Sequence, residues 1–98
     1  MIIRIVKLYV DPAKVSNFIR IYQDSKAFIK NSEGNISVQL VEDIHQKNIL
    51  FTISEWTSEE ALNNYRSSEF FGIVWAQVKP LLIAKTEAHS LATINESK

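Results

Sequence analysis

The stretch from Phe51 to Phe71, FTISEWTSEEALNNYRSSEFF, decides the fold of this 98-residue chain. Its first six residues alternate between two sides, which is the period of a β-strand: Phe51, Ile53 and Glu55 against Thr52, Ser54 and Trp56. A helix follows at once, because Thr57 or Ser58 can cap it and two glutamates fall in its first turn, where the helix dipole favours negative charge. The stretch therefore predicts a strand that runs directly into a helix.

The residues before this stretch predict a strand, a helix and a second strand. Residues 1–10 form a strand with two largely apolar faces. Asp11 and Pro12 are typical of a helix start, and apolar side chains then recur at helical spacing: Val15, Phe18, Ile19, Tyr22 and Ile29. Gly34 suits the left-handed position that closes such a helix. Residues 36–43 alternate again, and a polar turn leads into the returning strand.

The residues after the short helix predict a second helical piece and a last strand. We expect helices over residues 58–66 and 69–83, with Pro80 ending the second one early. A weakly apolar strand over residues 84–94 follows, and residues 95–98 are expected to form a frayed tail. The order β-α-β-β-α-β is the split arrangement of ferredoxin-like folds, an α+β class with one antiparallel sheet. We expect a single domain over residues 1–94.

Composition excludes several classes of function. The net charge is zero, with 11 basic and 11 acidic residues, so nothing favours a nucleic-acid or membrane partner. There is no cysteine, which excludes disulfides, thiolate catalysis and cysteine-based metal sites. The first strand is too short and too charged for a signal peptide or a membrane span. We expect a cytoplasmic protein.

The central features resemble the antibiotic biosynthesis monooxygenase (ABM) domain. These features are a glycine at position 34, an alternating strand, the strand ending in Glu55-Trp56, the Ser-Glu-Glu-Ala-Leu helix and, after a Ser-Ser break, an aromatic second helix. The resemblance covers about residues 2–94. It implies helices on one face of the sheet and two chains joined into a dimeric α/β barrel.

A homodimer is also expected from the first strand alone. Both of its faces are largely apolar, and the helices are enough to cover only one of them. We expect a second subunit to cover the other face. The resemblance to the ABM domain implies that Glu55 lies on that surface, and we expect it to pair there with Arg4.

A pocket for a planar aromatic or quinol substrate is predicted between the sheet and the helices. We assign the face of the first strand that carries Lys7 and Tyr9 to this pocket, because its partners are aromatic. Lys7 and Tyr65 are the candidate catalytic residues, since a partly desolvated ammonium and a phenol can stabilise a substrate anion. The candidate substrate-binding residues are Tyr9, Tyr22, Phe71 and Trp75. The alternatives are that Lys7 extends to the sheet edge or meets Glu55, and that the aromatic residues are simply core.

No metal or cofactor is expected. Neither His45 nor His89 has a second ligand at a metal-binding spacing. Haem-degrading relatives of the ABM domain use an asparagine, a tryptophan and a histidine, and the corresponding positions here are Lys7, Tyr65 and Trp75. Since none matches, we expect no haem turnover.

The resemblance implies a cofactor-independent monooxygenase that oxidises a small aromatic or quinol molecule with dioxygen. Two alternatives remain open. One is an enzyme that isomerises or degrades a small signalling metabolite, and the other is a non-catalytic dimeric module for ligand binding or stress response.

Overall fold

The computed structural model describes residues 1–94, and the expected tail over residues 95–98 lies outside the described residues. The predicted β-α-β-β-α-β order is confirmed, with the second helix in two pieces. The elements are β1 (Ile2–Tyr9), the 3-10 helix η1 (Pro12–Lys14), α1 (Val15–Lys30), β2 (Asn35–Glu42), β3 (Ile49–Trp56), α2 (Glu59–Arg66), α3 (Glu69–Val78), the 3-10 helix η2 (Lys79–Leu81) and β4 (Glu87–Leu91).

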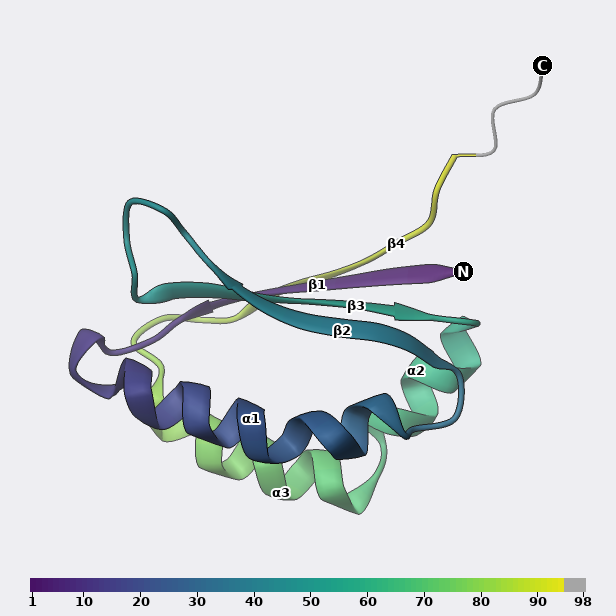
Figure 1. Cartoon of the computed structure of the whole chain (residues 1–98), viewed down its shortest axis with the longest axis horizontal. Helices are drawn as coiled ribbons and strands as arrows, with labels where there is room; N and C mark the ends of the chain where they lie inside the picture. The colour runs from purple at the N-terminus through teal and green to yellow at the C-terminus, as the bar shows by residue number, and fades with distance from the viewer. Residues whose placement is uncertain (95–98) are drawn as a thin grey trace.

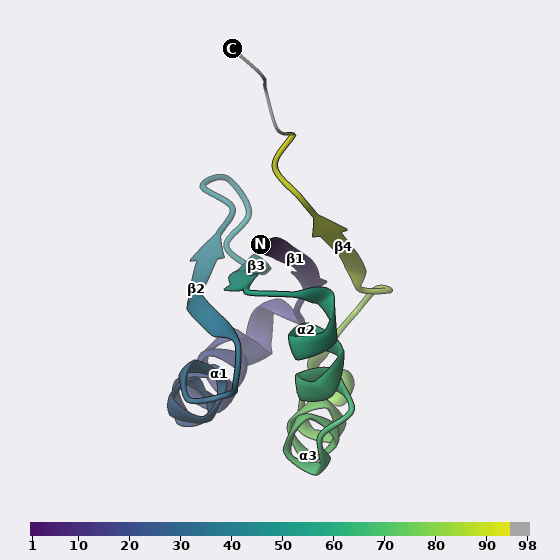
Figure 2. The same ribbon diagram turned by 90° about the vertical axis from the view of Figure 1, so that its right-hand side faces the viewer.

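The strands form one antiparallel sheet in the order β2-β3-β1-β4. Chain neighbours β2 and β3 make a hairpin, and the two helical connections bring β1 and β4 alongside, which is the ferredoxin-like arrangement. Figure 1 shows all the helices on one side of this sheet. In the end view of Figure 2, α1 lies below the β2 side, while α2 and α3 lie below the β1 and β4 side. No element of the described chain covers the other face of the sheet, which we call the open face.

Cross-strand pairing decides which side chains face the helices. Leu8 of β1 pairs with Leu50 of β3, and both are buried together with Phe18 of α1 and Val78 of α3. Because side chains alternate along a strand, Arg4 and the other even-numbered residues of β1 face the helices. The odd-numbered residues, Ile3, Ile5, Lys7 and Tyr9, therefore lie on the open face. The prediction that this face turns toward the helices was wrong.

Local signals account for the ends of the helices. Side-chain oxygens of Ser58 and Ser68 accept hydrogen bonds, both 3.1 Å long, from backbone N–H groups in the first turns of α2 and α3. Pro80 lies in η2, so α3 ends at Val78 as expected. Gly34 has φ of +85°, and a Cβ atom at this position would collide with Ala61 of α2. The glycine is thus required both by backbone conformation and by the approach of α2.

Two further expectations need correction. The last strand is shorter than predicted, because only Glu87–Leu91 pairs with β1. Arg4 and Glu55 do not pair, since alternation places them on opposite faces of the sheet. The Ser37 hydroxyl instead lies 2.8 Å from a carboxylate oxygen of Glu55, and Arg4 turns toward β4.

Within residues 1–94, no helix is long and apolar enough to cross a membrane.

Candidate functional site

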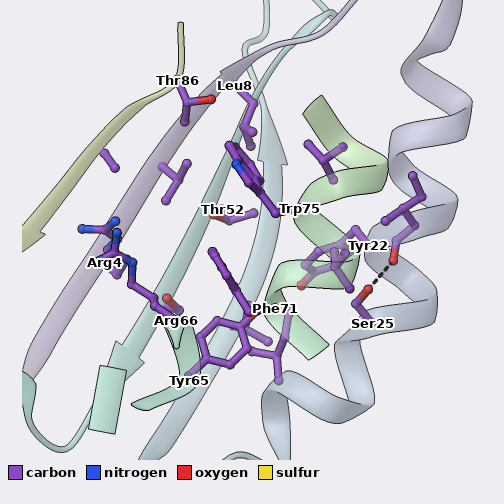
Figure 3. Close-up of a pocket in the computed structure, with 18 of the residues that line it drawn as sticks. Arg4, Leu8, Tyr22, Ser25, Thr52, Tyr65, Arg66, Phe71, Trp75 and Thr86 are labelled. Carbon is purple, nitrogen blue, oxygen red and sulfur yellow. Dashed lines mark hydrogen bonds between the residues drawn. The ribbon is translucent and has the colours of Figure 1, made fainter. Parts of the chain in front are cut away.

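A cavity of about 340 Å³ lies between the helices and the sheet. This volume is at the lower end of the range for small-molecule sites, roughly 300–1,000 Å³. All four strands and all three α-helices contribute side chains to its wall, and most of these side chains are apolar. Figure 3 shows the labelled residues around this space. The predicted pocket between the two layers is therefore present, although part of its lining differs from the expectation.

A row of aromatic rings forms one wall. The ring of Phe71 meets that of Tyr65 edge-on, with centroids 5.2 Å apart, and is nearly parallel to Trp75, with centroids 6.4 Å apart. Phe71 and Trp75 are one helical turn apart on α3 and share a face, as their spacing predicts. Together these three rings offer flat apolar contact surfaces to a planar ligand.

Two hydroxyl groups of the wall are buried without a hydrogen-bond partner among the described residues. They are Tyr22 Oη on α1 and Thr86 Oγ1, just before β4. Burial also raises the pKa of Tyr22. A buried hydroxyl that lacks a partner costs free energy, so each of these groups can gain by bonding to a ligand or to water inside the cavity. Ser25, by contrast, is satisfied, because its hydroxyl donates to the carbonyl of Ile21 over 2.7 Å.

Tyr65 is the most strongly perturbed acid of the cavity. Burial raises the pKa of its phenol to about 12. The group therefore keeps its proton throughout the ordinary pH range, and it can donate a hydrogen bond to an oxygen atom of a ligand.

Arg4 and Arg66 bring positive charge to one end of the cavity. The Arg4 guanidinium donates from Nη1 to Ser90 Oγ over 2.9 Å. Its burial, and then the charge of Arg66, lower the pKa of Arg4. Within residues 1–94 the only ion pair joins Lys47 to Glu42, so neither arginine has a carboxylate partner there. The site predicted from the sequence included neither arginine. The available signal for Arg4 was its place on the β1 face that also carries Val6 and Leu8, whereas Arg66 lies at the end of α2.

Lys7 and Tyr9 lie outside this cavity. Both occupy the open face, where Lys7 Nζ lies 5.0 Å from the centroid of the Tyr9 ring and 5.8 Å from that of Phe51. The Tyr9 hydroxyl donates to Glu87 over 2.7 Å. The prediction that Lys7 and Tyr9 face the pocket was therefore wrong, because the assignment of the β1 face was wrong. The other four candidates, Tyr22, Tyr65, Phe71 and Trp75, all line the cavity.

The described residues do not bring together three His, Cys, Asp or Glu side chains that could hold a metal ion. His45 lies in the exposed turn between β2 and β3, and His89 is exposed on β4. Neither histidine belongs to the cavity wall.

Comparison with known proteins identifies the family. The family model for antibiotic biosynthesis monooxygenase matches residues 1–72, so the chain belongs to the ABM family. No curated protein matches the chain. Among solved structures, a conserved protein from Methanosarcina mazei Go1 is 25% identical, with a TM-score of 0.87 over 93% of this chain and 91% of that one.

Two further structures share the fold at lower identity. Rv0793 from Mycobacterium tuberculosis is 22% identical, with a TM-score of 0.88 over 99% of this chain and 98% of that one. SnoaB, a cofactor-independent oxygenase from Streptomyces nogalater, is 16% identical, with a TM-score of 0.85 over 97% of this chain and 94% of that one. Both structures thus share the ferredoxin-like architecture of this chain.

Proposed function

We propose that this protein is a cofactor-independent monooxygenase that oxidises a small aromatic or quinol substrate with dioxygen. The observation that carries the proposal is the cavity, in which aromatic rings and buried hydroxyls surround a space suited to a planar molecule. Membership of the ABM family and the likeness to SnoaB, a cofactor-independent oxygenase, support the same chemistry.

The proposed reaction uses the substrate as its own reductant. An electron-rich aromatic loses a proton from a hydroxyl group, and the resulting anion transfers electrons to dioxygen. One oxygen atom then forms a bond to a ring carbon. The other leaves as water with the two hydrogen atoms that the substrate loses, so all electrons that reduce dioxygen come from the substrate.

The cavity residues have separate roles in this proposal. Phe71 and Trp75 hold the ring system by stacking and keep water away from the reacting carbon. The Tyr65 hydroxyl donates to the substrate oxygen on which negative charge develops, and Tyr22 bonds a second polar group. Arg4 has the role that was predicted for Lys7, since its positive charge at the cavity favours the ionised substrate.

We also propose that the protein works as a homodimer joined through the open face. Ile5 and Ile53 pair across β1 and β3 on this face, and Leu91 of β4 exposes 44% of its surface there. Burying these side chains against a second sheet is favourable by the hydrophobic effect.

Oxygen uptake tests the proposed function. The protein, treated with a chelator, is mixed with 1,4-dihydroxynaphthalene and related quinols in an oxygen electrode. We expect uptake that scales with protein concentration and falls in the Tyr65→Phe variant. Quinols that bind to the protein without faster uptake would favour the alternative of a non-catalytic binding module.

A further inference from the structure

The arginine pair of the cavity is not explained by the fold. Arg66 lies in the last turn of α2, where a cation is favoured by the helix dipole, and this accounts for its place along the helix. It does not account for a second arginine beside it. Figure 3 shows Arg4 and Arg66 at the same end of the cavity, near Tyr65, and both belong to its wall.

The positive charges of Arg4 and Arg66 repel each other. Their repulsion adds to the burial that lowers the pKa of Arg4, and no carboxylate among residues 1–94 lies close enough to either guanidinium to form an ion pair. The carboxylates nearest in the sheet are turned away, since Glu55 lies near Ser37 and Glu87 accepts from Tyr9, both on the open face. An anion between the two guanidinium groups would remove this repulsion.

The two arginines lie near Tyr65 of the aromatic wall, so an anion bound between them would be close to the aromatic rings. Tyr65 precedes Arg66 in α2, and its ring meets Phe71 edge-on in the cavity. A molecule whose rings lie against Phe71 and Trp75 can therefore extend an acidic substituent toward the arginines. Guanidinium groups are planar and bind the planar carboxylate through paired hydrogen bonds.

We propose that Arg4 and Arg66 bind a carboxylate carried by the aromatic substrate, so that the natural substrate is a hydroxylated aromatic acid rather than a neutral quinol. The substrate class named here depends on the proposed function, whereas binding of the probes below does not.

Calorimetric titration with two matched probes tests this assignment. The acidic probe is 1-hydroxy-2-naphthoate, and the neutral probe is 1-naphthol, which has the same rings and hydroxyl group without the carboxylate. We expect the wild-type protein to bind the acid about tenfold more tightly, a typical value for one charge-assisted contact that is partly exposed to solvent. Added salt should reduce this preference, because Arg66 is exposed.

Three variants complete the experiment. In Arg4→Met and Arg66→Met the preference for the acid should fall to about twofold or less. Arg20→Met is the matched control, because Arg20 is exposed on α1 and lies outside the cavity wall, and it should keep the wild-type preference. Arg66→Met decides the test if Arg4→Met does not fold, since the Arg66 side chain is exposed and makes no hydrogen bond among the described residues.

Equal binding of the two probes by the wild-type protein, including no binding of either, would overturn the assignment. A preference that persists in Arg66→Met would do the same. Neither result bears on oxygen uptake with neutral quinols, so failure of this assignment and failure of the proposed function are separate outcomes.

Discussion

The indole ring of Trp56 stacks on the phenol ring of Tyr65, with centroids 5.2 Å apart and 28° between the planes. Trp56 ends β3 and is 1% exposed, and its Nε1 donates to Ser54 Oγ over 3.0 Å. Tyr65 comes from α2 and lines the cavity. Trp56 also lines the cavity, so one buried side chain belongs both to the core and to the wall of the site, which connects the stability of the fold to the geometry of the site.

Trp56→Ala should strongly destabilise the protein. Truncating a buried tryptophan typically lowers the free energy of unfolding by about 3–5 kcal/mol. This loss is a large share of the total free energy of unfolding of a domain of this size. Denaturation with urea, compared between the variant and the wild type, measures the loss. A variant of equal stability would mean that Trp56 is not part of the core in solution.

Tyr65→Phe should lower turnover with little change in melting temperature. The phenylalanine ring keeps the contacts with Trp56 and Phe71, so only the donor to the developing anion is lost. Removing such a donor reduces the rate by about 10²-fold in other enzymes. Tyr9→Phe is the matched control, since the Tyr9 hydroxyl lies on the open face and donates to Glu87. Equal rate losses in the two variants would contradict the placement of the site in the cavity.

The stability of the protein should fall between pH 10 and pH 12, in part because of Tyr65. Its pKa is raised from 10.0 to about 12 in the folded protein. Below pH 10 the phenol is protonated in both the folded and the unfolded states, so its contribution to the free energy of unfolding is fully present. Between the two pKa values only the unfolded state releases the proton, and this release stabilises the unfolded state relative to the folded one. Urea denaturation across this range should show a smaller loss in Tyr65→Phe than in the wild type, and identical curves would contradict the raised pKa.

The sequence predicted the order of the elements because their signals are local. Ser58 and Ser68 cap their helices, Gly34 closes the first connection, and Pro80 marks the end of α3. Each of these signals depends on a few neighbouring residues, so it can be found without knowing the tertiary structure. The aromatic spacing of Phe71 and Trp75 on one helical face was predictable for the same reason.

The orientation of β1 was not predictable in this way. Both faces of the strand are apolar, and each carries one cation near its middle, Arg4 on one and Lys7 on the other. Alternation shows that these two side chains point apart, but it does not show which face the helices cover. That choice depends on the packing of Leu8 and Leu50 against Phe18, which is a tertiary contact. The cavity arginines were missed as a consequence.

Ile53→Glu should convert the proposed dimer to a monomer. Ile53 pairs with Ile5 on the open face, so a dimer joined there would have to bury the new carboxylate without a partner. Ile73→Glu is the matched control, because Ile73 is 53% exposed on α3, away from this face. Sedimentation at micromolar concentration should give twice the chain mass for the wild type and the control, and the chain mass for Ile53→Glu. A wild-type monomer would remove the proposed interface.

The most direct test of the central proposal follows oxygen atoms from dioxygen into product. Dioxygen labelled with oxygen-18 is supplied to the chelator-treated protein with 1,4-dihydroxynaphthalene, and the product is analysed by mass spectrometry. A monooxygenase that works without a cofactor should give a hydroxylated quinone with one labelled oxygen atom, in an amount that depends on intact protein and falls in Tyr65→Phe. If labelled product forms equally with heat-denatured protein, or if the protein yields only the unlabelled quinone, the cavity is not a monooxygenase site for quinols.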